Sequence, residues 1–405
     1  MAIHLLKLQS PLHDENVVNK AADDFIEAVM ENLSRPIIEV DEPKDDKTPL
    51  VVYITTGGVE GLYAKKFPKG SSPVYLLTHH SNNSLPAALE IADFERQRGN
   101  TVEVLHGTSE KVAQRLAIIE GVYFARASLE GARFGIIGQP SDWLIAAKYS
   151  KEWIKSFMGI ELIDIPLSEL EELLDEEDVS LEEEHHMAAQ LRSKAKDEES
   201  IDKALAVHRA LRKLCKSFRL DGFTIRCFDM VTKRKTTACL ALSLLNSDGV
   251  LAGCEGDVPA MLSMILLRAL SGQNAFQANP SFIDEDKNEV TFAHCTIPID
   301  LPFSYELDTH FESGLGVAIK GKLKKGPATV FKMNAYDGSY FVSEGTILEK
   351  ESDHRLCRTQ VSLHLAEAVS YFFHGAIGNH HIIAPGSHGK LIKEYFSVYK
   401  KVTNR

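Results

Sequence analysis

Hydrophobic runs alternate with helical patterns through the first third of the chain. Residues 50–54 (LVVYI) and 74–77 (VYLL) are apolar runs that indicate buried strands, and residues 85–98 have the apolar spacing of an amphipathic helix. A third strand at 101–105 and a second long helix at 109–124 follow. Strands that alternate with helices in this way predict parallel β-α-β units with right-handed crossovers.

The alternation restarts after Gly131, and the pattern changes again from about residue 280. In the middle of the chain we predict helices across 143–158 and 187–218, with strands at 134–137, 161–165, 223–228 and 239–245. Glycine and charged turns then divide short strand-like runs, which predict an antiparallel, barrel-like unit: 289–294, 316–322, 328–333, 340–348 and 357–363.

The predicted fold class is therefore α/β, with two open doubly wound domains followed by an antiparallel β-barrel-like domain. We place an N-terminal α/β domain at residues 1–127 and a central α/β domain that carries Glu255 at 128–272. A β-rich domain at 273–405 carries His294 and His381. A length of 405 residues suits two or three such domains.

Charge and composition narrow the possible partners. The formal net charge of −12 argues against non-specific nucleic-acid binding, and we expect the acidic run at 167–184 to be an exposed helical segment. The sequence has neither a run of about 18 uncharged apolar residues nor a signal-peptide pattern at its start, so we expect no membrane partner. The six cysteines form no CxxC pair, which favours reduced thiols in the cytoplasm.

Two polar loops follow predicted strands. Residues 55–58 (TTGG) match neither GxGxxG nor GxxxxGK[ST], which favours a tight turn over a nucleotide loop. Residues 78–84 (THHSNNS) occupy the same place in the next unit, and they are a candidate sugar-binding loop with the side chains of His79, His80 and Asn83. Capping of the following helix by Ser84 explains the same polar residues equally well.

The strongest chemical signal is Cys254-Glu255-Gly256-Asp257, between an apolar strand and an apolar helix. A carboxylate such as Glu255 just past a buried strand needs a partner or a function. Asp257, followed two residues on by proline, also has the pattern of an ordinary helix N-cap. His294 ends a predicted strand and His380-His381 lie in a glycine-led turn, but with 16 histidines the spacing alone leaves a metal site open.

Three segments resemble, in order and rough spacing, the L-fucose/L-arabinose isomerase family. Residues 252–257 (AGCEGD) resemble its glutamate signature, 292–295 (FAHC) its histidine-bearing strand and 378–381 (GNHH) its late His-His element. The match spans residues 250–405. The resemblance implies three domains, a ring-shaped homo-oligomer (trimer or hexamer) and an active site at a subunit boundary.

The resemblance also implies a ligand set for manganese or a similar divalent ion: Glu255, Asn279, His294 and His381. Asn279 stands where the family places an acid, and an amide can bind a metal but cannot exchange a proton at neutral pH. We expect His381 rather than His380 to face the metal, because adjacent residues of an extended segment point to opposite sides.

The function that the resemblance implies is aldose–ketose isomerisation through an enediol, on a pentose, a deoxyhexose or a sulfonated hexose such as sulfoquinovose. Glu255 and Asp257 are the expected catalytic residues, while His380 joins the residues of the 78–84 loop in sugar binding. Arg226 and the basic run at 233–235 are candidates for holding a sulfonate. Two alternatives stay open: a sugar-binding regulator that has lost catalysis, and another metal-dependent sugar enzyme such as an epimerase.

Overall fold

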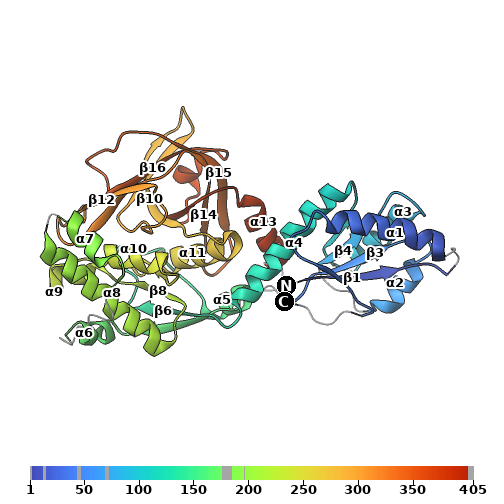
Figure 1. The fold of residues 1–405 in the computed structure, drawn as a ribbon, viewed down its shortest axis with the longest axis horizontal. Coiled ribbons are helices and arrows are strands. Elements are labelled where there is room, and N and C mark those ends of the chain that lie inside the picture. The colour runs from blue at the N-terminus through green and yellow to red at the C-terminus, as the bar shows by residue number, and fades with distance from the viewer. Residues whose placement is uncertain are drawn as a thin grey trace. The chain divides into compact units, whose positions relative to one another are not determined.

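The computed structural model of the protein describes residues 2–11, 15–42, 47–68, 73–175, 185–195 and 197–399. The chain forms two compact units, Met1–Ala127 and Ser128–Arg405 (Figure 1). No helix within the described ranges is long and apolar enough to cross a membrane.

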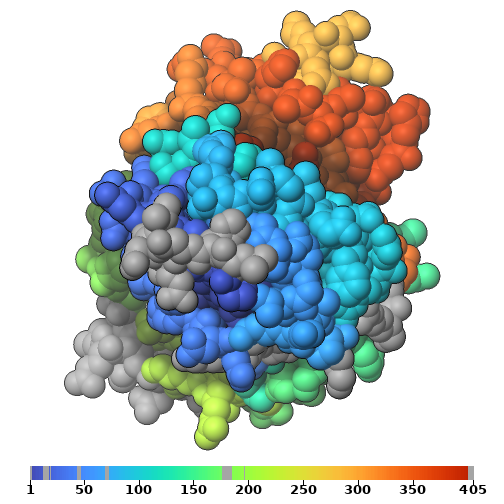
Figure 2. Space-filling view, turned by 90° about the vertical axis from the view of Figure 1, so that its right-hand side faces the viewer, coloured from blue at the N-terminus to red at the C-terminus, as the bar shows by residue number. Residues whose placement is uncertain are grey.

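The first unit is built on a five-stranded sheet in the order β2-β1-β3-β4-β5, with every neighbouring pair parallel. Its surface is coloured blue to cyan in Figure 2. Buried side chains of the sheet and its helices form one apolar core. The elements are β1 (Ile3–Leu8), α1 (Glu15–Met30), β2 (Ile37–Glu39), β3 (Leu50–Ile54), α2 (Glu60–Lys66), β4 (Val74–Leu77), α3 (Ser84–Gln97), β5 (Val102–Leu105) and α4 (Ser109–Leu129).

The second unit begins with a four-stranded parallel sheet in the order β7-β6-β8-β9. Its strands are β6 (Arg133–Ile137), β7 (Glu161–Ile165), β8 (Gly222–Ile225) and β9 (Leu251–Gly253). The helices of this part are α5 (Lys151–Met158), α6 (Leu167–Asp175), α7 (Ala188–Lys194), α8 (Glu198–Phe218), α9 (Phe228–Arg234), α10 (Cys239–Ser247) and α11 (Val258–Ser271).

A closed barrel of six strands completes the second unit, in the order β10-β11-β16-β15-β14-β17 with antiparallel neighbours. Phe292, Val330 and Ile383 are among its fully buried residues. The elements are β10 (Phe276–Asp284), β11 (Glu289–His294), β14 (Gly326–Met333), β15 (Tyr340–Leu348), β16 (Thr359–Leu365) and β17 (His381–Pro385), with the hairpin β12 (Ser304–Asp308) and β13 (Ala318–Lys322) and the helices α12 (Tyr371–His374) and α13 (Gly389–Tyr399).

Helix α11 links the sheet to the barrel. It packs against β9 of the sheet and against β14 and β17 of the barrel, and Figure 1 shows it between the two. Its residues are buried almost all round, as expected for a helix that is apolar on every face. Its N-terminus, with the segment Cys254–Asp257 in front of it, is therefore held where the sheet meets the barrel.

Several predicted elements are confirmed and two are wrong. The strands at 50–54, 74–77, 161–165 and 289–294 are present. Residues 239–245, predicted as a strand, belong to helix α10, because the run is rich in Leu and Ala and has no β-branched residue. The run is apolar throughout because the helix is buried on all sides. The helix predicted at 143–158 begins only at Lys151, after Ser150 caps it.

The coarse fold class is confirmed: parallel sheets combine with a closed antiparallel barrel. The arrangement as two doubly wound domains and the boundary at residue 272 remain predictions. Of the acidic run at 167–184, α6 is helical and residues 176–184 lie outside the described ranges.

Candidate functional site

Three side chains from distant parts of the second unit converge on one point. Glu255 lies between β9 and α11, His294 ends β11, and His380 immediately precedes β17. Glu255 Oε1 is 3.6 Å from His294 Nε2 and 3.5 Å from His380 Nε2. All three residues are buried, and the two imidazole rings meet edge to face at 5.3 Å.

The backbone around Glu255 has an uncommon conformation. Glu255 has a φ of +63°, a left-handed value that costs a residue other than glycine about 1–3 kcal/mol. Gly256 follows with a φ of +69°, and a Cβ there would lie 2.6 Å from the carbonyl oxygen of Gln139. The close approach lets the amide of Ser141 donate to the Glu255 carbonyl oxygen at 2.9 Å. The same turn brings Trp143 to the site, where its indole Nε1 donates to Glu255 Oε2 at 2.7 Å.

Asp257 is the second carboxylate of the site and also caps α11. Its Oδ1 accepts a hydrogen bond from the amide of Ala260 at 2.8 Å, so the N-cap pattern is confirmed. Its Oδ2 accepts from His380 Nδ1 at 2.8 Å and lies 3.5 Å from the Nζ of Lys332, which is only 2% exposed. Asp257 therefore fixes the ring of His380 so that Nε2 points at Glu255.

Charges of opposite sign hold this buried group in its ionised form. Burial opposes ionisation of Glu255, but the rings of His294 and His380 outweigh it and hold its pKa well below the ordinary value. Burial likewise opposes ionisation of Asp257, yet Lys332 and His380 lower its pKa to about 2. Burial disfavours the charged form of His380, but the two carboxylates raise its pKa to about 9. Without a bound ion the two carboxylates therefore favour a proton on His380, and an ion bound at Nε2 would take the place of that proton.

The structure brings His380, and not the expected His381, next to Glu255. His381, and not His380, points away from Glu255: its Nε2 lies 3.1 Å from the hydroxyl of Tyr371, and its ring packs among Phe292, Phe341 and Phe372. Burial lowers its pKa to about 3. Alternation along the extended segment does send the two rings to opposite sides, but the sequence does not say which side faces the site.

Two cavities adjoin the group. The larger, of about 260 Å³, is lined by residues that include Trp143, Asp257, Lys332 and Asn379. The smaller is lined by Glu255, Asn279 and His294 together with five of the six cysteines: Cys227, Cys239, Cys254, Cys295 and Cys357. All six cysteines are free thiols, in agreement with the absence of a disulfide framework.

The donor set suits a divalent ion. Glu255 Oε1 lies 3.6 Å from His294 Nε2 and 3.5 Å from His380 Nε2, and each of these separations is one that two atoms about 2.0–2.2 Å from the same ion can have. His380 Nε2 is buried and has no hydrogen-bond partner among the residues that the structure describes, so its nearest polar neighbour of opposite charge is Glu255 Oε1 at 3.5 Å. The thiol of Cys254 also lies near Glu255 and His294, but it faces Cys227 at 3.3 Å, and that contact and its burial raise its pKa well above the usual value. His380 is therefore a better candidate than Cys254 for a third ligand position beside Glu255 and His294.

Asn279 lies at the rim of the same group. It lines the smaller cavity with Glu255 and His294, and its side-chain oxygen accepts a hydrogen bond from Asn379 at 3.1 Å. Because an amide oxygen has two lone pairs, this bond leaves one available to an ion.

The candidate sugar loop belongs to the first unit. His79 is buried, with Nδ1 3.2 Å from the Tyr53 hydroxyl and Nε2 without a hydrogen bond, whereas His80 and Asn83 are exposed. Ser84 is not the cap of α3: the N-cap is Asn83, and the Ser84 hydroxyl instead donates to the carbonyl of Ile54. The loop is thereby tied to the end of β3.

Two residues of the site escaped the sequence analysis. Trp143 had no signal, since it reaches Glu255 from 112 positions away along the chain. The sequence did contain a signal for Lys332, because a lone lysine inside the apolar run of β14 must have a charged partner if it is buried. Three of the four basic residues proposed for a sulfonate are already paired: Arg226 with Asp142 and Asp229, Lys233 with Glu171, and Arg234 with Asp175.

The parallel sheets, the closed barrel and the buried Glu-His-His group define an α/β protein with a candidate divalent-metal site. No protein-family model matches the chain. A sulfoquinovose isomerase of Priestia aryabhattai is 25% identical over 309 residues, which is 71% of this chain and 67% of that protein. The sulfoquinovose isomerase of Priestia megaterium gives the same figures, and that of a Clostridium species is 27% identical over 40% of this chain and 37% of its own length. These similarities support a distant isomerase-like relationship and do not show membership of the L-fucose/L-arabinose isomerase family.

Proposed function

We propose that the protein is a divalent-metal-dependent aldose–ketose isomerase. The observation that carries the proposal is the convergence of Glu255, His294 and His380, with a buried His380 Nε2 that has no hydrogen-bond partner in the described part of the chain. The similarity to proteins named sulfoquinovose isomerase supports the same reaction class. Glu255, His294 and His380 would hold the ion, with the amide oxygen of Asn279 as a further ligand; the imidazole and oxygen donors suit manganese.

Isomerisation moves a proton between C1 and C2 of the sugar through an enediol. When bound, the metal ion supplies charge stabilisation for the sugar oxygens. Glu255 would take the proton from carbon, since its carboxylate is ionised and its Oε2 is held in place by Trp143. Asp257 would act by fixing His380 through Nδ1, as carboxylates behind metal-bound histidines do.

The reaction also needs a group that moves the hydroxyl proton, and Asn279 cannot do so. We assign this role to Asp257, which lines the larger cavity beside Lys332. Its Oδ2 lies within reach of both the His380 ring and the lysine ammonium, so a proton can pass along this row of groups. An active isomerase needs such a proton-transfer group, whereas a sugar-binding protein that has lost catalysis does not.

For the substrate we propose an aldose, with a sulfonated hexose as the first to test. The support is the name of the relatives and the presence of the Lys332 cation in the wall of the larger cavity. Arg226 and Lys233 are less suited to a sulfonate, because neither of them lines the two cavities beside Glu255.

We further propose that the protein works in the cytoplasm as a homo-oligomer, a trimer or hexamer, in which the loop with His79, His80 and Asn83 completes the site of a neighbouring copy. The support is its position at the carboxyl end of β4, where open parallel sheets bind ligands, and the buried Nε2 of His79, which has no hydrogen-bond partner within the described ranges. Light scattering combined with activity tests this assembly, and a fully active monomer would remove the shared-site proposal.

A panel of aldoses tests the reaction directly. The protein is incubated with manganese and each sugar in deuterated water, and products are identified by NMR. The proposal predicts a ketose and deuterium at the carbon that gains the proton. Formation of an epimer instead would make the protein an epimerase, and binding without exchange of any carbon-bound proton would make it a sugar-binding protein.

A further inference from the structure

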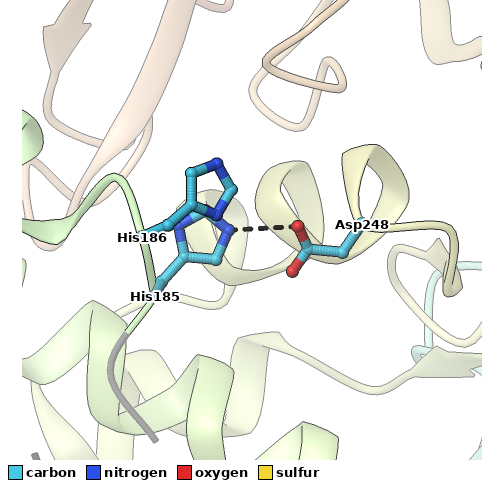
Figure 3. A group of neighbouring side chains, drawn as sticks. All are labelled: His185, His186 and Asp248. Carbon is cyan, nitrogen blue, oxygen red and sulfur yellow. Dashed lines mark hydrogen bonds and ion pairs between the residues drawn. The ribbon is translucent and has the colours of Figure 1, made fainter. Parts of the chain in front are cut away.

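The group of titratable side chains shown in Figure 3 lies outside the Glu255 site and has a structural role. His185 Nδ1 accepts a hydrogen bond from the amide of Met187 at 3.1 Å, and its Nε2 donates to Asp248 Oδ1 at 3.2 Å. His208 Nε2 lies 3.4 Å from the other carboxylate oxygen, Oδ2. Both oxygens of Asp248 thus face an imidazole, and the group joins the segment before α7 to α8 and α10.

One wall of the larger cavity, in contrast, offers polar groups to a ligand. Lys332 of β14 and Asn334, which directly follows that strand, both line the cavity. The amide of Asn334 donates to the carbonyl of Ser339 at 2.8 Å, so the extended conformation continues past Met333. Residues two apart along an extended segment point to the same side and lie about 6.7 Å apart. The wall therefore runs about 6.7 Å from Lys332, which contacts Asp257, to Asn334.

The facing segment brings a second lysine to the far end of this wall. Tyr149 forms a parallel bridge with Ala335, and the amide of Ser150 donates to the Ala335 carbonyl at 3.1 Å. Because Tyr149 and Ala335 are paired in parallel, the residues before them, Lys148 and Asn334, lie side by side. Both of them line the larger cavity.

Lys148 and Asn334 present hydrogen-bond donors that no neighbouring residue uses. The Lys148 side chain is exposed and makes no ion pair with any residue that the structure describes. The Asn334 side-chain oxygen accepts from the amide of Tyr336 at 3.1 Å, which leaves its amide nitrogen without a partner in the same part of the chain. An ammonium and an amide nitrogen are both donors, so together they suit a group that accepts hydrogen bonds and carries negative charge.

We propose that Lys148 and Asn334 form a subsite for a terminal oxyanion of the sugar, a sulfonate or a phosphate, with Lys148 as the specificity-determining residue. The inference rests on the proposed isomerase function, which places C1 and C2 of the sugar beside Glu255 and Asp257. The wall from Lys332 to Asn334 is comparable in length to an open-chain hexose. The last carbon of such a sugar, with its anionic group, therefore reaches the Lys148 ammonium.

Binding of sugar alcohols tests the subsite without turnover. The full chain with manganese is titrated in a calorimeter with a hexitol, with its 6-sulfonate and with its 6-phosphate. We expect a charged hexitol to bind at least about tenfold more tightly than the uncharged one, the usual contribution of a hydrogen bond to a charged group. Lys148→Met should reduce this ratio to about one and leave the Kd of the uncharged hexitol unchanged, whereas Lys148→Arg should keep most of the preference. The ratio between sulfonate and phosphate shows which oxyanion the subsite takes.

The matched control is Lys151→Met, because Lys151 is three positions further along the chain, does not line the cavity and pairs with Asp164 at 2.6 Å. It should leave every Kd unchanged. Asn334→Asp is a second test, since the new carboxylate keeps an acceptor for the Tyr336 amide but repels an oxyanion. It should weaken binding of the charged hexitols only.

The inference is overturned if the unmodified protein binds charged and uncharged hexitols equally, or if Lys148→Met keeps the preference for the charged ones. A protein that binds none of the hexitols would overturn the inference together with the sugar site on which it rests. A protein that prefers a charged hexitol but forms no ketose would leave the inference standing and contradict only the proposed function.

Discussion

Replacing His380 by asparagine should damage catalysis far more than the same replacement at the next residue. His380 donates from Nδ1 to Asp257 at 2.8 Å and directs Nε2 to Glu255 at 3.5 Å. His381 instead has its Nε2 3.1 Å from the hydroxyl of Tyr371 on the other side of the segment. Both rings are fully buried, so the two substitutions remove similar volumes and differ mainly in what the rings contact.

The expected size of each effect follows from these contacts. His380→Asn removes a hydrogen bond to a charged group, which contributes about 1.5–3 kcal/mol, and a proposed metal ligand as well. Since about 1.36 kcal/mol corresponds to a factor of ten, we expect kcat/KM to fall at least about 100-fold and the manganese Kd to rise at least about tenfold. His381→Asn removes a neutral hydrogen bond of about 1 kcal/mol, so kcat/KM should fall no more than about tenfold.

The assay measures ketose formation and manganese binding for both variants, with circular dichroism to confirm that each is folded. Tyr371→Phe is the matched control, because it removes the partner of His381 and leaves His380 untouched; it should stay close to the unmodified protein. The reasoning would be refuted if His381→Asn were as damaging as His380→Asn. It would fail equally if His380→Asn kept kcat/KM within about tenfold of the original.

Three further outcomes are expected. Glu255→Gln should lower kcat by about 10²–10⁴, the usual contribution of a proton-transfer group, and near-normal turnover would remove its role as base. Trp143→Phe keeps the edge contact with Phe228 but loses the hydrogen bond to Glu255 Oε2. Because Trp143 is half exposed, kcat should fall only about tenfold in steady-state assays. An unchanged kcat would show that this hydrogen bond does not contribute to catalysis. Burial raises the pKa of Cys215 to about 12, so a thiol reagent at pH 8 should not label Cys215 until the protein is unfolded. Peptide mapping would measure the labelling, and rapid labelling of Cys215 in the folded protein would contradict the prediction.

The sequence predicted the sheets better than the site. Runs such as 50–54 and 74–77 are strands because short apolar runs that contain β-branched and aromatic residues fit a buried parallel sheet. The run at 239–245 has no period that distinguishes a buried strand from a buried helix, and only its richness in Leu and Ala, without a β-branched residue, favours the helix.

The site was predictable only in part. The Glu-Gly corner before α11 pointed to Glu255, because a carboxylate beside a buried strand requires a partner. The choice between His380 and His381 depends on which face of β17 lies inside the barrel, and the local sequence does not contain that information. Trp143 reaches the site through a turn packed on Gly256, a contact between segments that no local pattern predicts.

A crystal structure with manganese bound, read by anomalous scattering at the metal's absorption edge, tests the central claim most directly. We expect one ion with a Glu255 oxygen, His294 Nε2 and His380 Nε2 each about 2.0–2.2 Å away. An ion bound by His381, or no ion beside Glu255 at saturating manganese, would contradict it.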